Sequence, residues 1–235
     1  MSCGLSTVNL RFRELKLSDY QPIVRFPSES FLMHSAKLLN RRRSCIVVSA
    51  VNRVILESLV DEFRRNASLL IIDFSNIHIN KEIDNEEFAK HIAKGITASA
   101  SLTRIDLSLN GLGNEGKHIA EGIAVSASLT DVDLSYNALC GVNFLGQGIF
   151  NANGIKEIAQ AISVSAALTR INLTGNSIGP MGAKHIAQGI SACKSLTSIN
   201  LYNNMLGDEG AKHVSDGIAV SASLTQVLVL LIQIK

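Results

Sequence analysis

LTRINLTGNSIGPMGAKHIAQGISACKS (168–195) and LTSINLYNNMLGDEGAKHVSDGIAVSAS (196–223) are consecutive copies of one 28-residue motif. Two earlier copies begin at Leu102 and Leu129. Each copy opens with a short strand-like stretch and closes with a helical one. A tandem period of this length and composition indicates a solenoid, in which every copy packs against the next. The sequence therefore predicts an α/β solenoid.

The apolar positions within one copy predict which side chains face the core. In the copy that starts at Leu102, Ile105 and Leu107 alternate with polar residues, as in a strand with one buried face. Further along, Ile119 and Ile123 are spaced as on one face of a helix. We expect these apolar side chains to point inward and the intervening polar side chains of the strand to point outward.

Two residue types recur between the strand and the helix of each copy. An asparagine occupies the ninth place, where a buried amide can satisfy backbone groups of the turn that neither sheet nor helix pairs. A glycine follows, which permits the backbone conformation of a tight strand-to-helix turn. The predicted structural turn residues are Asn110, Asn137, Asn176, Asn204, Gly113, Gly179 and Gly207.

The shared pattern LxxLxLxxNxLGxxGxxxIAxxI resembles the leucine-rich repeat of the ribonuclease-inhibitor type. That repeat also occurs in cytosolic innate-immune receptors and in the Ran GTPase-activating protein. The resemblance covers Leu102–Ser223. It implies a right-handed solenoid with a parallel β-sheet on the concave face and α-helices on the convex face. It also implies a concave face that commonly binds other proteins, and no catalytic role.

The repeats divide the chain into three parts. Residues 1–44 form an N-terminal segment of uncertain structure, and residues 45–68 contain an amphipathic pattern that predicts a helical N-terminal cap. The repeat array covers residues 69–235. Its copies start at residues 69, 102, 129, 168 and 196, and a truncated copy starts at 224.

Two of these copies depart from the common length. The copy from Leu102 is one residue short near Gly116, so its helix must adjust locally. The copy from Leu129 carries about eleven extra residues around 142–153. Inserted loops on rigid scaffolds often serve recognition, and apolar residues in this loop favour either that role or a fold back over the array.

The chain ends in LTQVLVLLIQIK (224–235), an apolar strand-like segment without a following helix. An uncovered edge strand of this kind invites pairing with another strand. We expect either that the sequence is a fragment of a longer array or that two copies associate edge to edge through this strand.

Composition and charge favour a cytoplasmic protein. Its four cysteines are widely separated, so neither a disulfide framework nor a zinc-binding cysteine motif is indicated. No apolar run approaches the length of a membrane span, and no secretory signal is recognisable. The net charge is +2, and aromatic residues are not interleaved with the arginines. We therefore predict neither membrane nor nucleic-acid binding.

Two motifs suggest a cofactor or a metal until the copies are compared. Gly111, Gly113 and Gly116 spell the GxGxxG of dinucleotide-binding folds. However, the first glycine is replaced by serine and methionine in sister copies. A histidine recurs in several helices, but one histidine per helix does not complete a zinc cage. We predict no cofactor, no metal site and no catalytic residue.

Outward-facing strand residues a full repeat apart become lateral neighbours, about 4.8 Å from each other. They form two columns, one mixing arginine with aspartate and the other changing from aspartate to asparagine. The predicted partner-binding residues are Arg104, Asp106, Asp131, Asp133, Tyr136, Arg170, Asn172, Asn200 and Tyr202. Tyr136 and Tyr202 are the expected anchors, because aromatic residues often dominate interface energetics. The alternative is a merely solvated polar sheet face.

The function predicted from these features is that of a non-catalytic scaffold or adaptor that binds a protein partner on the concave face. One alternative is a regulator of a small GTPase, by resemblance to the Ran GTPase-activating protein. Another is a fragment of an immune sensor of the type that joins leucine-rich repeats to a nucleotide-binding module.

Overall fold

The computed structural model describes residues 45–48, 50–51, 53–79, 83–143 and 145–229. The segment 1–44, for which the sequence predicted no particular structure, lies outside the described residues, as do 230–235 of the C-terminal strand-like segment.

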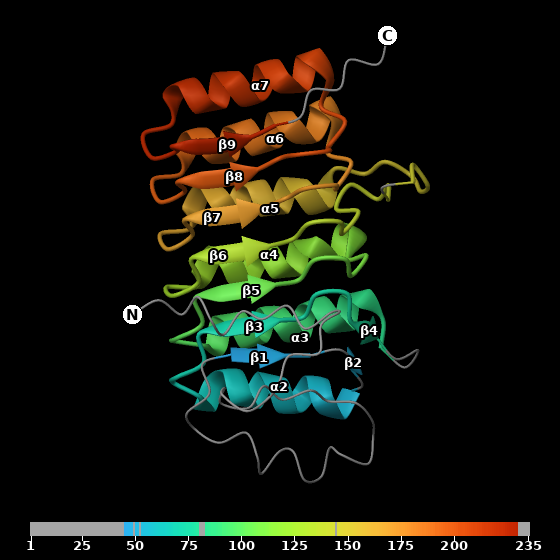
Figure 1. Ribbon diagram of the computed structural model, residues 1–235, viewed down its shortest axis with the longest axis vertical. Helices are drawn as coiled ribbons and strands as arrows, with labels where there is room; N and C mark the ends of the chain where they lie inside the picture. Colours follow the sequence, from blue (N-terminus) through green and yellow to red (C-terminus); the bar gives the residue numbers. More distant parts are fainter. Residues whose placement is uncertain (1–44, 49, 52, 80–82, 144, 230–235) are drawn as a thin grey trace, which may run out of the picture.

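One parallel sheet runs the length of the array (Figure 1). In spatial order its strands are β1 (Cys45–Val47), β3 (Ile71–Asp73), β5 (Arg104–Asp106), β6 (Asp131–Asp133), β7 (Arg170–Asn172), β8 (Ser198–Asn200) and β9 (Gln226–Leu228). Two shorter strands, β2 (Ala50–Val51) and β4 (His78–Ile79), pair separately. Because each strand neighbours the next one along the array, residues one repeat apart lie side by side.

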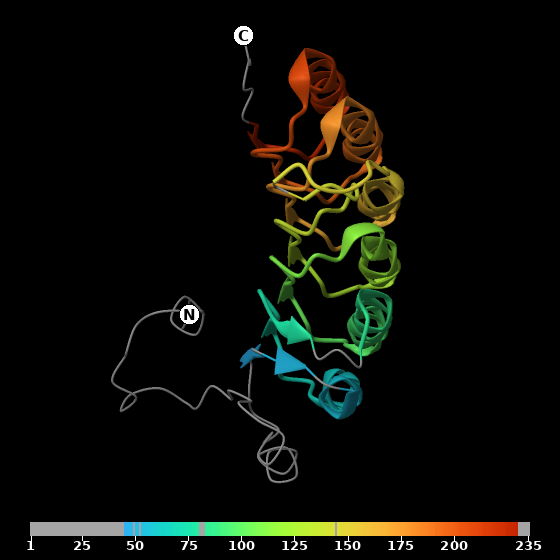
Figure 2. The same cartoon turned by 90° about the vertical axis from the view of Figure 1, so that its right-hand side faces the viewer.

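One layer of helices covers the other side of the coil. The helices are α2 (Arg53–Arg65), α3 (Asn85–Ala98), α4 (Gly116–Val125), α5 (Asn153–Val164), α6 (Gly179–Ala192) and α7 (Gly207–Val220). Figure 2 shows the helices along the outer curve and the sheet along the inner one. In Figure 1 the strands run from left to right in front of the helices, and the chain returns behind them as it rises from blue to red. This path makes the solenoid right-handed. The predicted α/β solenoid is confirmed.

The core lies between the two layers and is continuous along the array. The central residues of the strands, among them Ile105 and Val132, are fully buried. The helices stack closely because glycines face the preceding helix: a Cβ at Gly189 would lie 2.5 Å from the carbonyl oxygen of Ala159. Such close packing explains why the helical half of the repeat is rich in small residues.

The first described unit contains a strand in addition to the expected helix. Helix α2 packs against the array through Leu59 and Phe63, which are buried. In addition, Cys45–Val47 forms strand β1, which pairs in parallel with β3. The segment 45–68 is therefore a strand-plus-helix unit like the repeats that follow, and its strand extends the sheet.

The copy that is one residue short adjusts at the start of its helix. A 3-10 turn, η2 (Gly113–Glu115), precedes α4. Helix α4 has 10 residues, whereas α3, α6 and α7 have 14 each. The missing residue thus shortens the regular helix and tightens its first turn.

The insertion projects from the array at the carboxyl ends of the strands (Figure 1). Its own hydrogen bonds hold it: Asn143 N donates to the Gln147 carbonyl oxygen, and the Asn143 side chain accepts from two backbone amides of the loop. Leu145 and Ile149 are exposed. The described part of the loop therefore does not cover the array with these two side chains.

Candidate functional site

The inner face of the sheet presents the two predicted columns. Strand pairing aligns Ile71, Arg104, Asp131, Arg170, Ser198 and Gln226 in one row and Asp73, Asp106, Asp133, Asn172, Asn200 and Leu228 in the other. The side chains between the rows point into the core. Strand register therefore brings together seven of the nine predicted partner-binding residues on this face.

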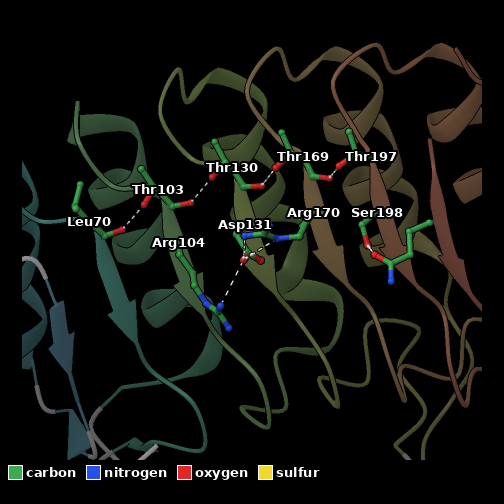
Figure 3. Close-up of polar contacts among 10 residues, drawn as sticks. Leu70, Thr103, Arg104, Thr130, Asp131, Thr169, Arg170, Thr197 and Ser198 are labelled. Carbon is green, nitrogen blue, oxygen red and sulfur yellow. Dashed lines mark hydrogen bonds and ion pairs between the residues drawn. The ribbon is translucent and has the colours of Figure 1, made fainter. Parts of the chain in front are cut away.

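A compact charge cluster occupies the middle of the first row (Figure 3). Arg170 donates to Asp131 Oδ2 from Nε at 3.1 Å and from Nη2 at 2.9 Å, while Arg104 Nη1 lies 3.5 Å from the same oxygen. The Asp131 side chain is only 15% exposed, and that of Arg170 is 61% exposed. The two arginines compensate the carboxylate and leave the cluster with a net positive charge.

The second row has a structural role that the sequence prediction missed. Each acid or amide accepts a hydrogen bond from the backbone amide two residues later, as Asp106 Oδ1 does from Ser108 N at 2.9 Å and Asn200 Oδ1 from Tyr202 N at 3.0 Å. Asn172 also donates to Asp133 Oδ2 at 2.9 Å. These side chains stabilise the turn after the strand by the local bonding that favours Asp and Asn in turns.

Burial raises the pKa of Asp106. Desolvation of its carboxylate is the largest cause, and Asp133 and Asp73 in the same row add like-charge repulsion, partly offset by hydrogen bonds from Ser108. Further along the row, Asn172 and Asn200 keep the accepting oxygen without a charge. The row therefore changes from acidic to neutral along the array while its turn-stabilising role is maintained.

A ladder of threonines borders the face (Figure 3). Thr103 Oγ1 donates to the Leu70 carbonyl oxygen at 2.9 Å, and Thr130, Thr169 and Thr197 each donate to the carbonyl of the preceding threonine at 3.0 Å. These residues were not among the predicted ones. The signal that identifies them is the LT pair that opens all four copies.

The two tyrosines do not share a column. Tyr202 is 40% exposed at the seventh place of its copy, on the open face. Tyr136 occupies the eighth place with φ +56° and is partly buried; a Cβ at Gly175 would lie 2.5 Å from its ring. Glycine in the next copy thus makes room for the Tyr136 ring. The structure leaves Tyr202 as the more accessible of the two aromatic side chains.

The turn asparagines form a second ladder beneath the face. Asn176 donates from Nδ2 to the carbonyls of Leu134 and Leu173, both at 2.9 Å, and accepts at Oδ1 from Asn137 N at 3.0 Å. Asn137 and Asn204 are likewise fully buried, whereas Asn110 is partly buried. Each amide thereby joins the turn of its own copy to that of the preceding copy.

Comparisons with known proteins place this architecture. The family model described as "Leucine Rich repeat" matches residues 98–116, 165–187 and 192–215. These three segments are similar to leucine-rich repeats. No curated protein sequence matches it. Among solved structures, the C-terminal domain of Caenorhabditis elegans tropomodulin has 15% identity and a TM-score of 0.46, with 76% of this chain and 84% of that domain covered.

A second solved structure, "Leiomodin-1 Actin-Binding Site 2 (ABS2)", has 13% identity and a TM-score of 0.43, with 83% of this chain and 90% of that one covered. At these values the two likenesses carry no argument about function. The leucine-rich-repeat architecture itself fits a protein-interaction scaffold, and domains of this type are typically binding domains rather than enzymes.

The turn geometry of these leucine-rich repeats accounts for the GxGxxG motif. Gly111 has φ +61°, and its sister residues Ser177 and Met205 have φ +53° and +54°. Gly113, Gly179 and Gly207 follow with φ between +55° and +61°. The same left-handed turn is built with and without the first glycine, so the motif is explained by the turn alone.

None of the helices in the described ranges is long and apolar enough to cross a membrane.

Proposed function

We propose that this chain is a non-catalytic scaffold or adaptor that binds a protein partner on the concave sheet face. The observation that carries the proposal is the exposed cluster of Arg104 and Arg170 around Asp131, on a rigid sheet in which the surrounding polar side chains are fixed by turn hydrogen bonds. A pre-organised array of this kind loses little conformational entropy on binding.

The chemistry of the face favours a partner with acidic side chains opposite the first row. Arg170 projects from the cluster and retains donors that Asp131 does not use, and arginine is over-represented among residues that dominate binding energy. Tyr202 supplies an aromatic contact two repeats beyond Asp131 on the same face. The exposed apolar side chains of the insertion, including Ile149 at 87%, add a second contact surface at the rim.

The test is affinity capture from a native extract, followed by titration of each captured protein. The triple variant Arg104→Ala, Arg170→Ala, Tyr202→Ala is compared with wild type. A matched control carries Lys156→Ala and Lys184→Ala, two exposed positions on the helical face. We expect the concave-face variant to lose at least one partner that the control retains. An identical set of partners for both variants would refute binding at this face.

The same proposal includes the subtype of the repeat and a location in the cytoplasm. The 28-residue period and the 14-residue helices of α6 and α7 support the ribonuclease-inhibitor type of repeat. The buried free thiols of Cys140 and Cys193 are consistent with the reducing cytoplasm. Regulation of a small GTPase remains an alternative, which a GTP-hydrolysis assay with candidate GTPases tests. Membership of an immune sensor would require a nucleotide-binding module beside the repeats.

Self-association through the C-terminal strand is also part of the proposal. Strand β9 lies at the edge of the sheet and pairs only with β8 among the described strands. Leu228 at this edge is exposed. Unpaired strand edges favour addition of another strand. Size-exclusion chromatography with light scattering tests the idea, and a monomer at high micromolar concentration would rule it out.

A further inference from the structure

The imidazole of His118, in the first turns of α4, lacks a hydrogen-bond partner. Its side chain is 12% exposed, and both Nδ1 and Nε2 are buried without a partner in the described part of the chain. A neutral imidazole has one N–H donor and one acceptor nitrogen, and buried polar groups are normally satisfied. The described protein groups therefore leave both ring nitrogens available to a further group.

Three carboxylates surround the ring. Nε2 lies 3.6 Å from Glu115 Oε2 and 3.9 Å from Glu86 Oε1, while Nδ1 lies 3.5 Å from Glu121 Oε1. These separations exceed the ordinary N–H···O distance of roughly 2.7–3.2 Å. The two distances from Nε2, to Glu115 and to Glu86, are near the roughly 3.4 Å that separates two ligands of a tetrahedral metal with bonds of about 2.1 Å.

The cluster arises where two helices of neighbouring repeats begin. Glu86 lies in the first turn of α3, and Glu115 ends the η2 turn just before α4. Because this copy is one residue short, Glu115 precedes His118 by three residues. In the copy from Leu196, which has the regular length, Glu209 precedes His213 by four residues, and its carboxylate lies 3.9 Å from the ring. His185, at the same place in α6, forms no ion pair within the described ranges.

We propose that Glu86, Glu115 and His118 bind a divalent transition-metal cation of the zinc class. His118 Nε2 and one oxygen from each glutamate are within 4.8 Å of one another and form the ligand set. Glu121 Oε1, 3.5 Å from Nδ1, is placed to accept a hydrogen bond from Nδ1–H once a cation fixes the ring, the usual arrangement that directs the other imidazole nitrogen to a metal. One histidine with two carboxylates suits zinc and leaves a fourth position for water.

This inference revises the expectation of no metal site. The sequence argument considered only histidines, one per helix, and those do not form a cage. The missing donors are carboxylates from the neighbouring repeat and from the shortened turn. Their convergence on His118 depends on the stacking of α3 against α4, which no single copy reveals.

Two lysines compete with the cation. Lys90 Nζ lies 2.6 Å from Glu86 Oε1, and Lys117 Nζ lies 3.1 Å from Glu115 Oε2. Both lysine side chains are well exposed, so each can turn into solvent, and each glutamate has a second oxygen. Without Lys90, Glu86 would lose its ion pair, and its carboxylate would be freer to bind a metal.

The experiment is calorimetric titration of tag-free, reduced protein with Zn²⁺, together with Co²⁺ absorption spectra that report tetrahedral coordination. We expect one site per chain. Glu86→Gln should weaken binding by about tenfold or more, and His118→Gln should abolish it. His185→Gln is the matched control and should bind as wild type does. Lys90→Met should bind more tightly than wild type.

Glu86 is exposed, so its substitution tests the site without endangering the fold, and circular dichroism checks that each variant is folded. The inference is overturned if wild type binds no Zn²⁺. It is equally overturned if folded Glu86→Gln and His118→Gln bind as wild type does, because the metal would then be held elsewhere, for instance by cysteine. Weaker binding by Lys90→Met would contradict the competition argued above.

Discussion

Replacement of Asn176 by alanine tests whether the buried amides hold the repeats together. Its side chain is fully buried and connects its own copy to the preceding one. Nδ2 donates to the carbonyls of Leu134 and Leu173, and Oδ1 accepts from Asn137 N and, at 3.3 Å, from Leu139 N. Alanine removes every one of these interactions and leaves backbone groups of two turns without partners in the core.

The expected loss follows from these orphaned groups. A buried donor or acceptor without a partner costs about 1–3 kcal/mol. Four hydrogen bonds are lost, of unequal strength, and the turn can relax in part after the substitution. We therefore expect Asn176→Ala to lower the free energy of unfolding by about 3–5 kcal/mol. That is a large part of the roughly 5–15 kcal/mol by which domains are normally stable.

Urea unfolding followed by circular dichroism measures the loss. Asn110→Ala serves as the comparison, because Asn110 has the same place in its copy but is only partly buried, so water can replace some of its bonds. We expect the smaller loss there. The unfolding curve of Asn176→Ala should also broaden, since repeats contact only their neighbours and a weakened junction uncouples the two halves. Equal losses in both variants, or a loss below about 1 kcal/mol for Asn176→Ala, would refute the reasoning.

Three further predictions concern single residues. Burial raises the pKa of Asp106 above its ordinary 3.8, so the carboxylate formed as pH rises lowers the stability of the folded state. Asp106→Asn should therefore raise the thermal midpoint at pH 7 but not below pH 3.8. Burial raises the pKa of Cys140 to about 12, so peptide mapping after alkylation at pH 8 should find it modified only in urea. Gly207 has φ +61° and open space around its Cα, so Gly207→Ala should cost about 1 kcal/mol in urea unfolding.

The sequence predicts much of the fold because the copies can be compared with one another. The alternation of Ile105 and Leu107 with polar neighbours identifies the buried face, and the recurring ninth-place asparagine identifies the turn. The shared strand motif that opens every copy then determines which strand residues become neighbours. Even the unequal copy is informative, since one missing residue near Gly116 predicts the local adjustment seen as the η2 turn.

Less follows from the sequence about individual side chains on that face. The prediction placed Tyr136 and Tyr202 together as anchors, yet a difference of one place within the copy sets one ring against Gly175 and the other in solvent. It also named only a helix within 45–68, because the strand-like CIV that begins the segment has no leucine-rich pattern to identify it.

What the sequence alone determined is the periodic part of this protein: the order of strands and helices, the parallel sheet, and the two outward columns. These depend on backbone register, which the recurring strand motif imposes on every copy alike. Only the tertiary structure decided that Arg104 and Arg170 compensate Asp131, and that Glu86 and Glu115 converge on His118. Such contacts join different copies, and they depend on side-chain conformation and on one-residue differences between repeats, to which a periodic pattern is insensitive.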